Sequence, residues 1–135
     1  MSSPVFLDAS FWIVYRDDEE AAHSLAVRIM NNLLRHRTPF VTTLPVVCEI
    51  HAYFTRDLLQ RESVLRDFFT NPLITIEEIL RQDQKAALEI LQIHRDKTYS
   101  LCDALSFMVM RRTNLKRAVT FDNHFKQFGE FEIIS

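Results

Sequence analysis

The stretch Pro4-Val-Phe-Leu-Asp8 decides how the rest of the sequence is interpreted. An apolar run that is short, continuous and ended by an acid is typical of a buried strand. Arg117-Ala-Val-Thr-Phe121 repeats this arrangement late in the chain, and it is also followed by an acid, Asp122. Strands that are apolar throughout are typical of parallel sheets covered on both faces. If the two strands are parallel neighbours, Asp8 and Asp122 lie close together at one edge of the sheet.

Helical and strand-like segments alternate along the whole chain. Strands are predicted at 4–7, 39–41, 73–76, 117–121 and 131–134. Helices are predicted at 10–15, 22–33, 61–69, 83–94, 100–112 and 123–128, with a further helix that has Pro45 in its first turn and reaches Leu58. This alternation predicts an α/β fold of three layers, in which a mainly parallel sheet of about five short strands has helices on both faces. No linker or repeat interrupts the pattern, so a single domain over 1–135 is expected.

Composition limits the classes of function. Sixteen Lys and Arg residues oppose eighteen Asp and Glu residues, which gives a formal net charge of −2. Proteins that coat nucleic acid are basic, so any nucleic-acid site in this chain must be local. The chain has a single glycine, Gly129, which excludes the glycine-rich loops of P-loop and dinucleotide-binding folds.

The sequence also indicates where the protein works. No apolar run approaches the roughly 20 residues that a membrane helix needs. The first residues, Met-Ser-Ser-Pro, lack the basic and long apolar segments of a secretory signal. Two cysteines are too few for a disulfide framework. A cytoplasmic protein that does not associate with a membrane is therefore expected.

Two further acids stand in unusual surroundings. Glu49 and Asp103 each lie within an apolar run that opens a predicted helix. Helices that follow parallel strands begin near the carboxyl edge of the sheet, so these two acids are expected to converge with Asp8 and Asp122. Four carboxylates in one cleft repel each other and raise each other's pKa. A hard divalent cation such as Mg²⁺ or Mn²⁺ removes this conflict, because it prefers carboxylate oxygens as ligands.

Each acid, taken alone, also has a purely structural interpretation. Asp8 and Asp122 stand where they can cap the helices that begin near 10 and 123. Ser100-Leu-Cys-Asp103 matches a capping box with Asp in place of Glu. Glu49 fits an exposed helix stripe. Capping does not require all four acids to meet at one edge, so their joint placement favours a cation site.

At these residues the sequence resembles the PIN-domain nucleases and, within them, the VapC-type toxins of toxin–antitoxin systems. The resemblance covers essentially the whole chain and rests on four blocks in the family's order: Phe6-Leu-Asp-Ala-Ser10, Leu44-Pro-Val-Val-Cys-Glu49, Ser100-Leu-Cys-Asp-Ala-Leu-Ser-Phe107 and Ala118-Val-Thr-Phe-Asp-Asn-His-Phe125. It implies a PIN-like domain whose catalytic and metal-binding acids are Asp8, Glu49, Asp103 and Asp122. It also implies that Ser10 and Thr120 hold these carboxylates in place.

The resemblance carries expectations about activity and partners. It implies a Mg²⁺- or Mn²⁺-dependent endoribonuclease that hydrolyses RNA phosphodiester bonds to 3′-hydroxyl and 5′-phosphate ends. It further implies a small cognate antitoxin and a homodimer. The RNA target is not readable from residue spacing.

One position departs from the family pattern. Many relatives have a second acid two residues beyond the position of Asp122, and here His124 stands in its place. This histidine is a candidate ligand for Mn²⁺ or a contact for phosphate, and an exposed side chain without a ligand is the alternative. The basic stretch from Arg111 to Arg117 is either a contact surface for RNA or a solvated face.

Two other functions are compatible with acids at strand ends. A phosphoacceptor receiver domain also uses such acids, together with a Thr. It requires a pair of acids after the first strand and a Lys after a late strand, whereas Asp8 has no adjacent acid and Phe121 is followed by Asp122 and Asn123. A non-catalytic partner-binding module on the same fold is the second alternative.

Overall fold

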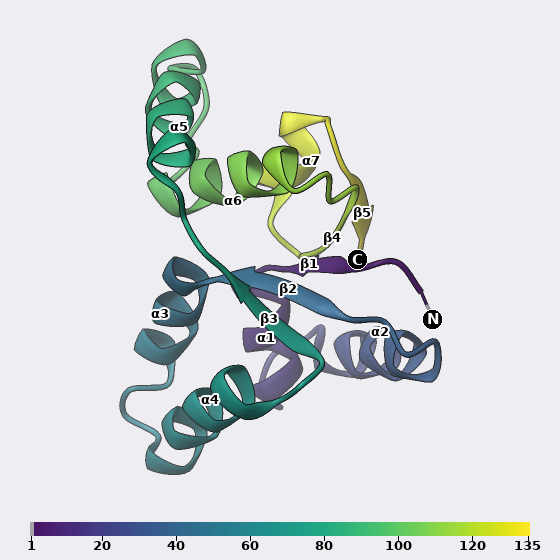
Figure 1. Ribbon diagram of the computed structural model, residues 1–135. Coiled ribbons are helices and arrows are strands. Elements are labelled where there is room, and N and C mark those ends of the chain that lie inside the picture. Colours follow the sequence, from purple (N-terminus) through teal and green to yellow (C-terminus); the bar gives the residue numbers. More distant parts are fainter. Residues whose placement is uncertain (1) are drawn as a thin grey trace.

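The computed structural model describes residues 2–135 and contains a sheet of five strands in the order β3-β2-β1-β4-β5 (Figure 1). The strands are β1 (Val5–Leu7), β2 (Phe40–Thr43), β3 (Ile74–Glu77), β4 (Arg117–Val119) and β5 (Glu132–Ile134). Every pair of neighbouring strands is parallel. The predicted α/β fold with a parallel sheet is therefore confirmed.

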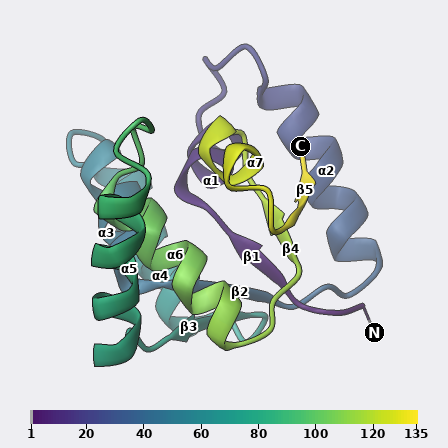
Figure 2. The same ribbon diagram turned by 90° about the horizontal axis from the view of Figure 1, so that it is seen from above.

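Seven helices in residues 2–135 cover the two faces of this sheet. One face carries α1 (Ala9–Arg16), α2 (His23–Arg35), α3 (Leu44–Tyr53) and α4 (Leu58–Thr70) (Figure 1). The other face carries α5 (Arg81–Ile93), α6 (Leu101–Arg112) and α7 (Asn123–Phe128), which lie in front of the strands in Figure 2. The three predicted layers are thus present. None of these helices combines the length and the apolar character that crossing a membrane requires.

β1 and β4 meet at the point where the strand order reverses. From β1 the chain builds outward through β2 to β3, and it then crosses to β4 on the other side of β1. Phe6 pairs with Ala118 and Leu7 with Val119. Open α/β sheets bind ligands outside the carboxyl ends of their strands at such a reversal. Residues that directly follow β1 and β4 therefore occupy the position that this fold favours for a ligand site.

Aromatic side chains fix the helices above this reversal point. Phe6 of β1, Phe107 of α6 and Phe125 of α7 are fully buried. The ring centroid of Phe125 lies 6.1 Å from that of Phe6 and 4.9 Å from that of Phe107. Burying one such ring stabilises the fold by about 1.5–3 kcal/mol. This packing holds α6 and α7 against β1.

Two strand boundaries differ from the prediction because of threonine side chains. The second strand continues to Thr43, since Thr42 is buried and its hydroxyl donates to the carbonyl of Leu7 at 2.9 Å. The predicted fourth strand, 117–121, ends at Val119. The next residue, Thr120, turns its hydroxyl toward the end of β1.

The prediction of a helix that reaches Leu58 and of a separate helix from residue 61 was wrong. The first helix, α3, ends at Tyr53, and Leu58 is the first residue of α4. Asp57 causes the new start, because its side chain caps α4 by accepting a hydrogen bond from the backbone N–H of Gln60 at 3.2 Å. The helix predicted from residue 83 likewise begins earlier, at Arg81.

Candidate metal centre

The four predicted acids come from four elements near the carboxyl edge of the sheet. Asp8 directly follows β1 and caps α1, and Asp122 follows β4 and caps α7. Asp103 lies in the first turn of α6, whereas Glu49 lies in the middle of α3. Asp8 and Asp103 are buried, and Glu49 is exposed as a residue.

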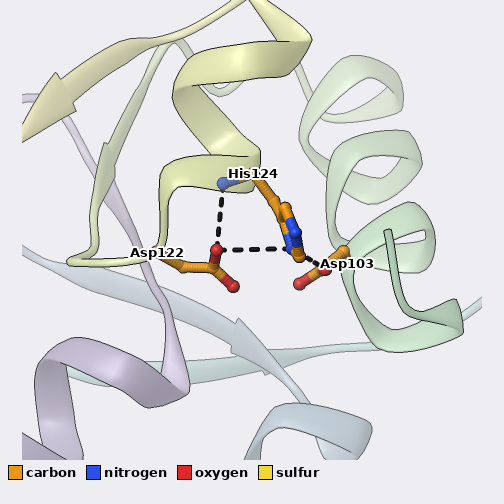
Figure 3. Close-up of side chains that lie close together, drawn as sticks. All are labelled: Asp103, Asp122 and His124. Atoms are coloured by element: carbon orange, nitrogen blue, oxygen red, sulfur yellow. Dashed lines mark hydrogen bonds and ion pairs between the residues drawn. The ribbon is translucent and has the colours of Figure 1, made fainter. Parts of the chain in front are cut away.

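Asp103, Asp122 and His124 form a close group (Figure 3). One ligand atom from each lies within 4.8 Å of the others. Nδ1 of His124 is 2.7 Å from Oδ2 of Asp103 and 3.3 Å from Oδ1 of Asp122. Within residues 2–135 no other group of acids, cysteines or histidines meets this spacing, so Asp8 and Glu49 lie outside the closest set. Two carboxylates and an imidazole are a donor set that fits a divalent cation.

Two hydroxyls hold the carboxylate of Asp8. Its Oδ2 accepts hydrogen bonds from Oγ of Ser10 at 2.6 Å and from Oγ1 of Thr120 at 2.7 Å. Each hydroxyl in turn accepts a backbone hydrogen bond, Ser10 from Phe121 at 3.0 Å and Thr120 from Asp122 at 2.9 Å. Each hydroxyl oxygen accepts a hydrogen bond from a backbone N–H group, and each hydroxyl donates its own hydrogen to Asp8. The network ties the end of β1 to the loop that carries Asp122.

Burial raises the pKa of Asp8 above its ordinary value. The hydrogen bonds from Ser10 and Thr120 act in the opposite direction, and the negative charges of Asp122 and Asp103 raise the pKa further. A cation close to these carboxylates would favour their charged forms. The buried carboxylate of Asp8 is thus in an environment that a bound cation would relieve.

The negative charges of the three aspartates also act on the carboxylate of Glu49. Its pKa is raised, first by partial desolvation of the carboxylate and then by the charges of Asp8, Asp103 and Asp122. Glu49 as a whole residue is exposed to water, whereas its carboxylate group is partly buried. Glu49 therefore lies close enough to interact electrostatically with all three aspartates, although it is not part of the closest group.

Capping and metal binding are not alternatives in this structure, because they use different oxygens. Oδ2 of Asp8 accepts the hydrogen bonds described above, and Oδ2 of Asp103 accepts from the backbone of Ser100 at 3.0 Å. Oδ1 of Asp122 accepts from the backbone N–H of His124 at 2.9 Å. In residues 2–135 no donor contacts the second oxygen of any of the three aspartates. Each aspartate can cap a helix and still offer one oxygen to a ligand.

Sequence reasoning missed Thr98. Its hydroxyl oxygen lies 3.0 Å from Nε2 of His124, on the opposite side of the ring from the carboxylates. The ring of Tyr99 packs edge-on against the same imidazole, with centroids 5.5 Å apart. No motif could have signalled this contact, because 26 positions separate Thr98 from His124 and the turn before α6 brings them together.

The arginines between α6 and β4 make structural contacts away from the acidic group. Arg111 forms an ion pair with Glu130, and Arg112 donates to the buried carboxylate of Asp83 at 2.9 Å. Arg117 donates to backbone and side-chain oxygens near the start of the described chain. The solvated-face interpretation is therefore correct in part, since these side chains also hold elements together.

Comparisons with known proteins agree with this arrangement. Residues 5–130 match the family model of the PIN domain. The chain is 28% identical over 131 residues to the 23S rRNA-specific endonuclease VapC20 of Mycobacterium tuberculosis strains CDC 1551 and H37Rv, with 96% of this chain and 97% of the relative covered. The crystal structure of M. tuberculosis VapC20, named there a Sarcin-Ricin loop cleaving toxin, superposes with a TM-score of 0.83 at 26% identity, covering 97% of this chain and 99% of the other.

A more distant structure shares the fold alone. VapBC2 from Rickettsia felis, bound to a DNA fragment from its promoter, superposes with a TM-score of 0.70 at 14% identity, and 97% of each chain is covered. The family match spans most of the chain, and the acids of the PIN-like blocks lie at the carboxyl edge of the sheet. The chain therefore belongs to the PIN-domain family, and the relatives that match its full length are VapC-type toxin endonucleases.

Proposed function

We propose that this protein is a metal-dependent endoribonuclease of the VapC type. The observation that carries the proposal is the group formed by Asp103, Asp122 and His124 beside the buried Asp8, at the reversal of strand order. Open α/β sheets favour this place for ligands, and the donor set fits a divalent cation. Full-length similarity to VapC20 supports nuclease chemistry at this position.

The proposed roles follow from which atoms are free. The oxygens of Asp8, Asp103 and Asp122 that take part in no capping contact would hold Mg²⁺ or Mn²⁺. Such a cation supplies charge neutralisation at the scissile phosphate and activates water for attack. Glu49, which lies in the electrostatic field of the three aspartates, would bind the cation or orient the attacking water.

Ser10 and Thr120 act on the reaction through Asp8. Their hydroxyls direct Oδ2 of Asp8 toward the loop after β4 and leave Oδ1 without a hydrogen bond from residues 2–135. Outer partners of this kind orient metal ligands, and their loss lowers metal affinity or activity about 10–100-fold. The two hydroxyls are therefore positioning groups.

We propose structured ribosomal RNA as the substrate. The relative with 28% identity over the full length is named a 23S rRNA-specific endonuclease. The net charge of −2 requires a local positive contact for RNA. Arg95 and Lys97 are exposed in the turn before Thr98, whose hydroxyl contacts His124, and we propose that they contact phosphates near the acids, Lys97 by exchanging its exposed ion pair with Asp96.

We also propose a small antitoxin as inhibitor and a homodimer as the assembled form, as the resemblance to VapC-type toxins implies. An antitoxin segment with an Arg or Lys would compete with the cation for the acidic group.

An apolar surface lies apart from the acidic group, around a cavity of about 830 Å³ on α3, α4, α5 and α6. Four large apolar side chains around it are at least half exposed: Leu44, Phe69, Leu88 and Leu101. Exposed apolar surface of this kind is typical of protein contacts, and light scattering on the purified protein measures the assembly state.

The test of the function uses intact ribosomes. Purified protein and its Asp103→Asn variant are incubated with 70S ribosomes and Mg²⁺ or Mn²⁺, with and without EDTA, and 23S rRNA ends are mapped by primer extension. We expect one new end with the wild-type protein and cation, and none with Asp103→Asn or EDTA. No new end with either protein would instead support a non-catalytic module, equal cleavage by both would contradict a role for Asp103, and labelling by acetyl phosphate would support a phosphoacceptor domain.

A further inference from the structure

His124 brings a nitrogen donor into a group that is otherwise made of carboxylates. Its Nδ1 lies 2.7 Å from Oδ2 of Asp103 and 3.3 Å from Oδ1 of Asp122 (Figure 3). The side chain is 23% exposed, so its ring is mostly enclosed by protein. Nδ1 faces the capping oxygen of each aspartate, and the second oxygen of each belongs to the same carboxylate, so a cation shared by the two carboxylates could also reach Nδ1.

The second ring nitrogen of His124, Nε2, contacts Thr98. Nε2 of His124 lies 3.0 Å from the Thr98 hydroxyl, and Tyr99 packs edge-on against the ring at an interplanar angle of 84°. At 2.7 Å the contact between Nδ1 and Oδ2 of Asp103 is a hydrogen bond, so without a cation Nδ1 carries the proton and Nε2 accepts from the Thr98 hydroxyl. A cation at Nδ1 would displace that proton, and Nε2–H would then donate to the Thr98 oxygen, which keeps the lone pair of Nδ1 directed at the cation. Histidine ligands in metalloproteins are commonly held by such a contact at the second ring nitrogen.

We propose that Thr98 positions His124 as a nitrogen ligand and that this ligand makes the centre select Mn²⁺ over Mg²⁺. The inference rests on the proposed function only in treating the acidic group as a metal centre. Mg²⁺ is held in proteins by oxygen ligands and demands near-ideal octahedral geometry. Imidazole nitrogen suits first-row transition cations, and Mn²⁺ is the member of that series that also takes carboxylate oxygens, so a site with two aspartates and His124 favours Mn²⁺ over Mg²⁺.

Metal binding without RNA tests this inference. Metal-free protein is titrated with Mn²⁺ or Mg²⁺ by calorimetry, and nitrogen coupling to bound Mn²⁺ is measured by pulsed electron paramagnetic resonance. We expect Mn²⁺ to bind more tightly than Mg²⁺, with a clear coupling from one imidazole nitrogen. His124→Asp should retain Mg²⁺ binding, lose the nitrogen coupling and bring the two affinities together.

Thr98 is tested with a matched pair of variants. Thr98→Val removes the hydroxyl and keeps the shape of the side chain, and it should weaken Mn²⁺ binding about 10-fold while Mg²⁺ binding changes less. Thr98→Ser keeps the hydroxyl and should restore both the affinity and the nitrogen coupling. Thermal unfolding of each variant shows whether the fold is retained, so that a loss of binding is not confused with a loss of structure.

Two results would overturn the inference. One is bound Mn²⁺ without nitrogen coupling in the wild-type protein, and the other is a Thr98→Val variant that keeps wild-type Mn²⁺ affinity and coupling. Failure of the proposed function looks different, because Mn²⁺ would then bind through His124 while no RNA is cleaved. Cleavage with Mg²⁺ and Mn²⁺ alike, without nitrogen coupling, would contradict the inference and leave the nuclease proposal intact.

Discussion

Thr120 donates a hydrogen bond of 2.7 Å to Asp8, across 112 positions of the chain, and both residues are buried. The same hydroxyl oxygen accepts the backbone N–H of Asp122 at 2.9 Å. One threonine therefore links the buried acid at the end of β1 to the acid that follows β4. The parallel pairing of β1 and β4 brings the two acids to the same edge, and Thr120 adds a side-chain link between them beyond the end of β4 at Val119.

Thr120→Val tests the link between these acids. The variant leaves the backbone N–H of Asp122 without its partner and removes one donor from Asp8. A buried polar group left without a partner costs about 1–3 kcal/mol, so the free energy of unfolding should fall by that amount. RNA cleavage should fall as well, and Thr120→Ser should restore both. Urea unfolding and a cleavage assay measure the two effects; an unchanged Thr120→Val protein would refute the positioning role.

Asp83 provides a structural control away from the proposed centre. It is 2% exposed and accepts hydrogen bonds from Arg112 through both oxygens, at 2.9 and 3.0 Å. Arg112 is partly exposed and keeps its contacts with Glu77 and the carbonyl of Glu78, so the loss of Asp83 does not leave a buried charge unpaired. Asp83→Ala should lower the free energy of unfolding by about 1–3 kcal/mol, as for the loss of charged hydrogen bonds, with Mn²⁺ affinity of the folded protein unchanged. Glu77→Gln should lower the free energy of unfolding by under about 1 kcal/mol, because the ion pair between Glu77 and Arg112 is longer, at 3.6 Å, and more exposed to solvent.

Tyr53 gives a pH-dependent stability signal. Its hydrogen bond to Asp17, together with partial desolvation and the charges of Asp17 and Glu20, raises the pKa of Tyr53 to about 12. In the unfolded chain this phenol ionises near its ordinary value of 10.0. Between these values the folded state binds more protons than the unfolded state, so the free energy of unfolding should fall as pH rises above 10.

The Tyr53 prediction is measured by ultraviolet titration of tyrosinate. Asp17→Asn should lower the pKa of Tyr53 and reduce the loss of stability at high pH, and Tyr53→Phe should remove the contribution. If Asp17→Asn leaves the titration unchanged, the contact between the end of α3 and the acidic turn before α2 does not form in solution.

Asp8→Asn tests the electrostatic conflict among the acids. The raised pKa of Asp8 means that its ionised form destabilises the metal-free fold near neutral pH. Asp8→Asn should therefore be more stable than the wild-type protein in EDTA. A ligand at 100 times its dissociation constant stabilises a protein by about 2.7 kcal/mol, and this gain with Mn²⁺ should be much smaller in the variant. Thermal unfolding with and without Mn²⁺ measures the stabilisation of each protein. An equal rise in melting temperature for the wild-type protein and Asp8→Asn would contradict a role of Asp8 in binding the cation.

The fold could be predicted from the sequence because its strands are short and uniformly apolar. That pattern identified a parallel sheet, and the sheet put Asp8 and Asp122 at one edge without any knowledge of side-chain contacts. Boundaries were less predictable where polar side chains decide them. Thr42 lengthens β2 from within the core, and Asp57 starts α4 by capping it, although neither effect interrupts the hydrophobic pattern.

The candidate site could be predicted only in part. Residue types and order identified the acids, but they could not distinguish capping from ligand binding, because each aspartate uses one oxygen for a local hydrogen bond and keeps the other free of such contacts in residues 2–135. They also could not place His124, whose role depends on the turn containing Thr98. Contacts between distant segments depend on packing, which residue spacing does not encode.

Stepwise addition of Mn²⁺ tests the proposal that this protein cleaves RNA with a cation held by its aspartates. A 5′-labelled RNA hairpin with the sequence of the Sarcin-Ricin loop, the loop named for the relative VapC20, is incubated with metal-free protein before Mn²⁺ is added. We expect no cleavage before Mn²⁺ is added, one major product with a 3′-hydroxyl end afterwards, and no product with Asp122→Asn at any Mn²⁺ concentration. Equal cleavage by Asp122→Asn, or cleavage that persists in EDTA, would contradict the proposal.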